Sequence, residues 1–246
     1  MKSIRLLAAA AALALGSVSP LLAHASLVQN GSFDGDSLSG WQTFGDVLAT
    51  DGRASLTNGV ADGNPASLNQ TGTWSVDVGA EGGLAGVPVE SLDIGGTAYE
   101  GSAIAQHIGG AVGALFHVTF DWAFASSDAM FPDFGFVALN QTVHRFVSAS
   151  GETFGAVFLG TVVDAQNVSW NWFQSSYSAE AAADGSLALS LGVVDVGDYE
   201  GDSRLLLDNV RVSTNAVPEP GSAALMLAGL GVLGGVLRRR QRAQQG

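Results

Sequence analysis

The segment Leu115-Phe116-His117-Val118-Thr119-Phe120-Asp121-Trp122-Ala123-Phe124 decides the fold class of this chain. Large apolar side chains stand at every second position, with mostly smaller or polar residues between them: Phe116, Val118, Phe120, Trp122 and Phe124. Successive side chains of a β-strand point to opposite faces, so a period of two predicts a strand rather than a helix.

Other segments repeat this period. Leu187–Val193 and Leu205–Val212 alternate along their length, and a further strand is marked by Trp74, Val76 and Val78. Residues 134–139 and 142–147 flank Asn140-Gln141, which predicts a hairpin.

Turn dipeptides separate the predicted strands, namely Asp51-Gly52, Asn58-Gly59, Asp62-Gly63 and Asp184-Gly185. Only residues 178–183 have a helical composition. Short strands about 8–12 residues apart, joined by glycine-rich turns, predict an all-β fold, an antiparallel sandwich.

Composition excludes several classes of protein. The 246 residues include no cysteine, which excludes disulfide scaffolds, cysteine-ligated metal sites and thiol catalysis. Residues 26–216 carry 22 acidic residues against four arginines, a net charge near −18. Such a surface is soluble and argues against nucleic acid as a partner.

Residues 1–25 have the pattern of a secretory signal peptide. Lys2 and Arg5 precede an apolar stretch, 6–15, and Ala23-His24-Ala25 places small residues where signal peptidase cleaves. We therefore expect signal peptidase as a partner and a mature chain that begins at Ser26. The alternative is an N-terminal membrane anchor, for which ten apolar residues are too few.

The C-terminal segment, 215–246, has three parts. Val217-Pro218-Glu219-Pro220 precedes seventeen apolar or small residues, 221–237, and these precede Arg238, Arg239, Arg240 and Arg242. A helix of this length spans about 25 Å, a little less than the ~30 Å hydrocarbon core. The arginines favour the cytoplasmic side. The pattern predicts a single transmembrane helix with an accessible, proline-bounded peptide outside the membrane.

This ending resembles the PEP-CTERM sorting signal of Gram-negative bacteria. The resemblance implies export across the inner membrane and recognition of Pro-Glu-Pro by an exosortase, which removes the helix. It also implies a destination at the cell surface or in the extracellular matrix of an organism that makes exopolysaccharide and biofilm. The alternative is a plain tail anchor.

The region between the two ends, 26–214, resembles bacterial jelly-roll domains of the galactose-binding type. The opening, Leu27–Asp34 followed by Gly40-Trp41, and the close, Leu206–Val212, carry the resemblance, together with Ile104-Ala105-Gln106. Many carbohydrate-binding modules have this architecture. The resemblance implies a jelly-roll β-sandwich in which the first and last strands come together.

The same resemblance implies a structural Ca²⁺ near those two strands. The matching positions are Asp34 and Asp208, although related modules carry the longer Glu where this chain has Asp34. Ca²⁺ prefers six to eight oxygen ligands. The alternative is that Asp208 accepts backbone hydrogen bonds at a strand end and that Asp34 opens a turn.

The remaining acidic and aromatic residues offer candidates for metal binding and sugar binding. The acidic group Asp195, Asp198, Glu200 and Asp202 lacks the glycine and glutamate of an EF-hand and is interpreted as a solvated turn. No nucleophile elbow, P-loop or zinc motif occurs, so no catalytic residue is assigned. Trp170 and Trp172 share one face of a strand, where they line a sugar-binding groove or fill a core.

Together these patterns predict a noncatalytic, exported surface or matrix protein, sorted by an exosortase and associated with exopolysaccharide. The first alternative is a dedicated, calcium-stabilised carbohydrate-binding module. The second is a secreted hydrolase, in which two distant acidic residues meet in the fold.

Overall fold

The structure is a computed structural model that describes residues 26–128, 130–199, 201–215 and 229–230. The predicted signal peptide, with Ala23 and Ala25, lies outside the described residues. So do the sorting residues Val217, Pro218, Glu219 and Pro220 and the arginines Arg238, Arg239, Arg240 and Arg242. Among the described residues, no helix is long and apolar enough to cross a membrane.

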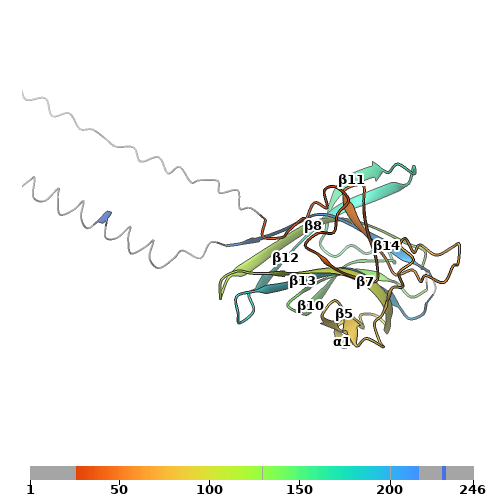
Figure 1. The fold of residues 1–246 in the computed structure, drawn as a ribbon, viewed down its shortest axis with the longest axis horizontal. Helices are drawn as coiled ribbons and strands as arrows, with labels where there is room; N and C mark the ends of the chain where they lie inside the picture. Colours follow the sequence, from red (N-terminus) through yellow and green to blue (C-terminus); the bar gives the residue numbers. More distant parts are fainter. Residues whose placement is uncertain (1–25, 129, 200, 216–228, 231–246) are drawn as a thin grey trace, which may run out of the picture.

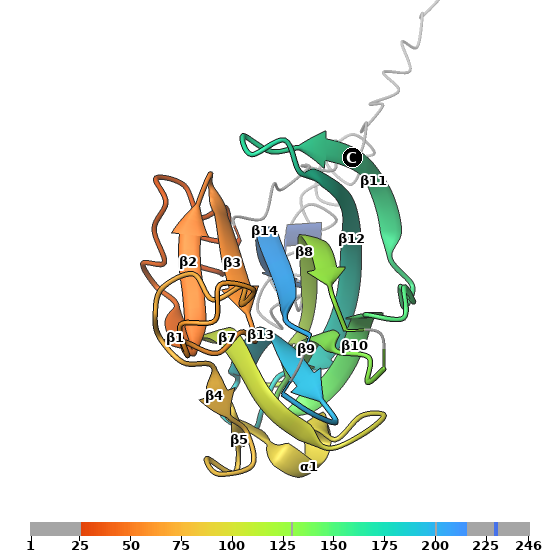
Figure 2. The ribbon, with the colours of Figure 1, turned by 90° about the vertical axis from the view of Figure 1, so that its right-hand side faces the viewer.

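Two antiparallel sheets pack face to face (Figures 1 and 2). Sheet A contains, in spatial order, β1 (Gln42–Phe44), β7 (Ala98–Ile108), β13 (Leu187–Val196), β9 (Phe134–Leu139) and β10 (Thr142–Ser148), and β4 (Val76–Asp77) also pairs with β7. Sheet B contains β11 (Val157–Val163), β12 (Ser169–Glu180), β8 (Leu115–Ser126), β14 (Ser203–Thr214), β3 (Arg53–Thr57) and β2 (Asp46–Thr50).

The chain changes sheet repeatedly along its length. From β7 in sheet A it passes to β8 in sheet B, then to β9 and β10 in sheet A, back to β11 and β12, and finally through β13 to β14. Alternation of this kind is typical of a jelly roll. The prediction of an antiparallel jelly-roll β-sandwich is confirmed.

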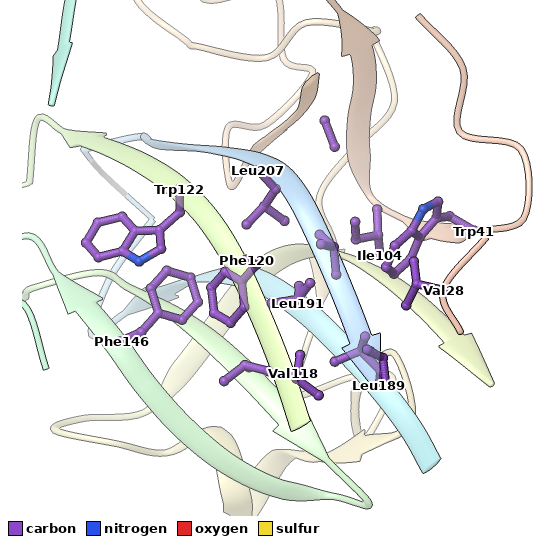
Figure 3. Packing of buried hydrophobic residues seen from close by; sticks show 14 of the residues in the cluster. Val28, Trp41, Ile104, Val118, Phe120, Trp122, Phe146, Leu189, Leu191 and Leu207 are labelled. Atoms are coloured by element: carbon purple, nitrogen blue, oxygen red, sulfur yellow. The ribbon is translucent and has the colours of Figure 1, made fainter. Parts of the chain in front are cut away.

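The core lies between the sheets (Figure 3). On β8 the alternating residues Phe116, Val118, Phe120 and Trp122 are almost fully buried, as the period of two predicts. They face a row of leucines and valine on β13, which comprises Leu187, Leu189, Leu191 and Val193. Among the described residues, every buried member of this core lies between Val28 and Val212.

A short segment covers the outer face of sheet A. It contains the small ladder of β5 (Gly83–Leu84) and β6 (Val87–Pro88), followed by α1 (Val89–Leu92). Figure 2 shows this segment on the side of sheet A that faces away from sheet B. Leu84 and Leu92 pack there against Phe134 and Phe136, so sheet A is buried on both faces. The outer face of sheet B is covered in part: residues 67–71 lie over β2, β3 and the start of β14, where Gln70 bonds to Ser55 and the Leu68 carbonyl accepts from Arg204.

The two ends of the sandwich meet at β14. The Leu27 amide donates to the Val212 carbonyl over 2.8 Å, and the Val210 amide donates to the Gly31 carbonyl, also over 2.8 Å. A Cβ on Gly31 would lie 2.0 Å from the Val210 carbonyl oxygen, so only glycine allows this approach. The opening of the domain therefore lies against its last strand, as expected.

One hairpin is confirmed, and one helix prediction is wrong. Asn140 and Gln141 have φ of 49° and 68° and join β9 to β10 in a turn of type I′ character. Of the predicted helical residues 178–183, the first three instead end β12, where Ser178 pairs with His117 of β8, and residues 181–183 lead into a turn. Cross-strand pairing outweighs the weak helix propensity of a short segment. Of the strand predicted around Trp74, only β4 forms.

Candidate binding groove

The predicted aromatic pair lies on the outer face of sheet B. In register, Trp172 is opposite Ala123, and Leu206 is opposite Ala123 on the other side. These three side chains and Trp170 form a small buried cluster outside the main core. Each tryptophan is only 7% exposed, so neither offers an open ring face to solvent.

A groove of about 320 Å³ runs over this face beside Trp172. Its wall is the edge strand β11, and its floor is formed by the central strands of sheet B. The lining residues are Arg53, Asp121, Leu159, Gly160, Thr161, Val162, Trp172, Asp208 and Asn209. Hereafter this site is called the sheet B groove.

Two carboxylates face each other across the groove floor, because Asp208 of β14 is in register with Asp121 of β8. A bulge follows Asp208, and Asn209 has a φ of 49°. This bend lets the Asn209 side-chain amide donate to Asp121 Oδ2 over 3.0 Å, while Gln174 Nε2 donates to Asp121 Oδ1 over 2.8 Å. The bulge therefore brings a carboxylate pair and an amide together.

Burial is the main cause that raises the pKa of Asp208 above its ordinary value. The backbone amide of Asn209 lowers this pKa by donating to Asp208 Oδ1, at 2.6 Å, and the charge of Asp121 raises it. The positive charge of Arg53 lowers it, and the charge of Asp34 raises it. Asp208 is therefore a carboxyl group whose ionisation depends on what enters the groove.

Arg53 is the basic residue that lines the groove. Its Cζ lies 5.1 Å from the centroid of the Trp172 ring, in a cation–π arrangement. The Trp172 indole Nε1 is buried without a hydrogen-bond partner, whereas Trp170 Nε1 donates to Asp164 Oδ2 over 2.8 Å. Trp172 thus lines the groove with the edge of a mostly buried ring, and its unpartnered Nε1 is buried as well.

The predicted calcium ligands are close enough to interact electrostatically, because Asp34 affects the pKa of Asp208. Asp34 Oδ2 accepts a hydrogen bond from Ser32 Oγ over 2.6 Å. No three acidic, histidine or cysteine side chains of the described residues form a group that could hold a metal ion. Two carboxylates supply fewer oxygens than Ca²⁺ prefers. Calcium here stays a prediction.

Sequence reasoning missed Arg53, Asp121 and Asn209. The register of β3, β8 and β14 brings them together, and single strands carry no signal of their pairing. Asp121 gave a partial signal, because it is a charged residue in an otherwise apolar strand and stands at one of the positions that face outward.

Trp74 was interpreted only as a strand residue, yet it is 57% exposed and lines a second groove of about 640 Å³.

Comparison with solved structures gives remote similarity to several β-domains. TmCBM61 in complex with β-1,4-galactotriose is 9% identical, with a TM-score of 0.37, over 78% of this chain and 99% of that chain. The N-terminal cellulose-binding domain of Cellulomonas fimi β-1,4-glucanase C is 11% identical, with a TM-score of 0.32, over 78% and 99%. The enzymatically active domain of tailspike protein 4 of bacteriophage CBA120 is 16% identical, with a TM-score of 0.32, over 77% and 21%. Scores of this size transfer no ligand or site.

Comparison of sequences finds no curated protein that matches the chain. The model of the PEP-CTERM protein-sorting motif matches residues 216–241, which include the Pro-Glu-Pro, the apolar stretch and the arginines singled out above. Residues 216–241 of this chain are therefore a PEP-CTERM protein-sorting motif.

Proposed function

We propose that this is a noncatalytic protein of the cell surface or extracellular matrix that binds polysaccharide in the sheet B groove. The sorting motif supports the first half of the proposal. An exosortase of the inner membrane of a Gram-negative bacterium recognises Pro218, Glu219 and Pro220 and removes the segment that follows. The exported body then works outside the cell, in the exopolysaccharide layer.

The observation that carries the binding half is the set of polar groups in the groove. Sugar hydroxyls both donate and accept hydrogen bonds. Asp121 and Asp208 offer acceptors, Arg53 offers donors, and the Asn209 amide offers both, all around one cavity. A few convergent polar groups beside apolar surface are typical of small-ligand sites. Trp172 and Val162 supply that apolar surface.

Charge narrows the class of polysaccharide. The groove contains two carboxylates and one arginine, and the body around it has a net charge near −18. This field repels uronic acid and sulfate groups at low ionic strength. The proposed ligand is therefore a neutral polysaccharide, recognised through its hydroxyl groups.

The test is affinity electrophoresis or calorimetry of residues 26–215 with neutral and acidic polysaccharide fractions. Saturable binding to a neutral fraction, lost in Asp121→Asn/Asp208→Asn and in Trp170→Ala/Trp172→Ala, is expected. Asp62→Asn, an exposed loop residue whose cap on Asn64 an asparagine can keep, is the matched charge control. Equal binding by the Asp121→Asn/Asp208→Asn variant would overturn the assignment to this groove.

One observation favours a second candidate, a secreted hydrolase. Asp121 and Asp208 face each other, and burial raises the pKa of Asp208 above its ordinary value. A pair of carboxyl groups, one of them with a raised pKa, is the usual catalytic arrangement of glycoside hydrolysis. The test is whether new reducing ends are released during the same incubations. Release that Asp208→Asn abolishes would show that the protein is a hydrolase and not a noncatalytic binding protein.

A further inference from the structure

A layer of carboxyl groups closes one end of the space between the sheets. On β13 the row of core-facing residues that includes Leu191 and Val193 continues to Asp195, which is 3% exposed. On β7 the row that includes Ile104 continues through Ser102 to Glu100, which is 8% exposed. Because β7 and β13 are paired, both rows change from apolar to acidic at the same end.

Asp133, which is fully buried, is the third member of this layer. Its Oδ2 accepts from Asn58 Nδ2 over 2.7 Å and from Ser203 Oγ over 2.6 Å, and its Oδ1 accepts from the Val196 amide over 3.2 Å. Asn58 Oδ1 also accepts from the Ser203 amide. Asp133 therefore ties together the chain after β3, the start of β9, the end of β13 and the start of β14.

Asp195 differs from Asp133 in its partners. Its Oδ1 atom is buried and has no hydrogen-bond partner. The charged groups that act on it are all acidic: Asp133, Asp198, Glu100 and Asp128. Asp128 itself has a buried Oδ2 without a partner. A buried carboxylate without a compensating charge or donor is costly, so Asp195 favours its neutral form.

Every element packed against the layer adds acidic or phenolic groups. The groups are Asp77 from β4, Tyr99 and Glu100 from β7, Asp128 and Asp133 from the β8–β9 connection, and Asp198, Tyr199 and Asp202 from the β13–β14 connection.

The arginines of the body are engaged elsewhere. Arg53 lies over Trp172, Arg145 lies 3.8 Å from Glu152, Arg204 donates to the Leu68 carbonyl, and Arg211 donates to Asn209. No three acidic or histidine side chains of the described residues are grouped so that they could hold a metal ion. Protonation of the carboxyl groups would neutralise the layer.

The pKa values of the three carboxyl groups of the layer also favour their neutral forms. Burial is the largest cause that raises the pKa of Glu100 and of Asp133 to about 7 and the pKa of Asp195 to about 9. Acidic neighbours raise all three further, and hydrogen bonds from Ser75 to Glu100 and from Ser203 and Asn58 to Asp133 act in the opposite direction.

We propose that this carboxyl layer is a proton-held latch that keeps Asn58, Asp133 and Ser203 together at the end of β13 while it is protonated and releases them as the external pH rises. The direction of this pH dependence follows from the linkage between proton binding and folding. A group with a higher pKa in the folded state binds protons on folding, so its contribution is complete below its unfolded pKa, near 4. That contribution is lost as the pH rises through 7 and then 9.

The test is thermal unfolding of residues 26–215 between pH 5 and pH 9.5, in wild type and Asp195→Asn. We expect the Tm of the wild type to fall by more than about 5 °C from pH 6 to pH 9. Asp195→Asn, which keeps the shape and removes the charge, should reduce this fall by half or more. Asp51→Asn, an exposed turn residue, is the charge control and should leave the slope unchanged.

A local readout separates a latch from a general loss of stability. Hydrogen exchange of the Val196 and Ser203 amides at pH 8.5 should be at least about threefold faster in wild type than in Asp195→Asn, whereas amides of β8 should not differ. If Asp195→Asn does not fold, Glu100→Gln takes its place. Equal pH slopes in wild type and variant overturn the latch. Restoration of the Tm at pH 9 by millimolar Ca²⁺ in wild type alone also overturns it and assigns a cation site.

Discussion

The sheet B groove and the carboxyl layer use the same residue type in opposite ways. In the groove, Asp121 and Asp208 are partly exposed and lie beside Arg53 and the Asn209 amide. In the layer, Asp195 is buried with only acidic charged neighbours. The surroundings therefore decide whether a carboxyl group is available to a ligand or is held as a neutral acid.

Burial alone does not produce that difference. Asp46 is fully buried and Asp195 is 3% exposed, yet the hydroxyls of Thr57 and Thr71 and the amides of Gln70 and Thr71 all donate to Asp46. Four donors satisfy its two oxygens, whereas Asp195 has a buried oxygen with none. The two buried carboxyl groups therefore differ in the number of donors around them rather than in depth.

The largest effect on stability should come from removing Asp133, the carboxyl group of the layer that accepts three hydrogen bonds. Asp133→Ala leaves Asn58 Nδ2, Ser203 Oγ and the Val196 amide without their acceptor, and each buried unsatisfied donor costs about 1–3 kcal/mol. We expect several kcal/mol of destabilisation in urea unfolding. Asp208→Asn, in the groove, is the matched comparison and should change stability by less than about 1 kcal/mol. Equal losses would remove the contrast between the two regions.

The calcium prediction should give the next largest effect. If Asp34 and Asp208 hold Ca²⁺, a concentration 100 times the Kd stabilises the fold by about 2.7 kcal/mol. The melting curve in millimolar Ca²⁺ should then exceed that in EDTA, and Asp34→Asn should abolish the difference. Identical curves in the two buffers would contradict the prediction and leave the groove without a metal.

A smaller effect is expected from the groove arginine. Arg53→Ala removes a cation–π contact with Trp172 that contributes about 0.5–1 kcal/mol at an exposed site. It also removes the positive charge that lowers the pKa of Asp208, so this pKa should rise further. Carboxyl NMR titration of Asp208 measures the shift. An unchanged Asp208 pKa would show that Arg53 does not control the carboxylate pair.

The last prediction separates the two regions by pH. Between pH 5 and pH 6 the folded layer stays mostly protonated, since its pKa values are about 7 and 9, whereas the same carboxyl groups ionise near pH 4 in the unfolded chain, so the Tm should already fall as the pH rises. Polysaccharide affinity should follow the ionisation of Asp208 instead. A parallel change of Tm and affinity would mean that the two groups of acids are coupled.

Much of the fold could be predicted from the sequence because its signals are local. The alternation along β8 gave a strand with Phe116 and Phe120 inside, and Asn140-Gln141 gave a hairpin. The helix predicted at residues 178–183 was wrong because pairing with β8 is a long-range interaction. The PEP-CTERM motif, a contiguous pattern, was identified directly.

The sites were harder to predict because they depend on register. Trp170 and Trp172 do share a face, but nothing local shows that Leu206 and Ala123 bury them. Likewise Asp195 was interpreted as part of a solvated turn, and the structure corrects this: it is buried at the end of β13. Its neighbours Asp133 and Glu100 lie about 60 and 95 residues earlier in the chain.

The place of β14 in sheet B has a mechanical consequence. This last strand before the sorting motif lies between β8 and β3 rather than at an edge, and it carries Asp208 and Asn209 of the groove. A pull on the chain beyond residue 215 acts along β14, so its two ladders bear the load together in shear instead of opening one bond at a time. A polymer held in the groove and a pull on the chain beyond residue 215 would therefore act on the same sheet.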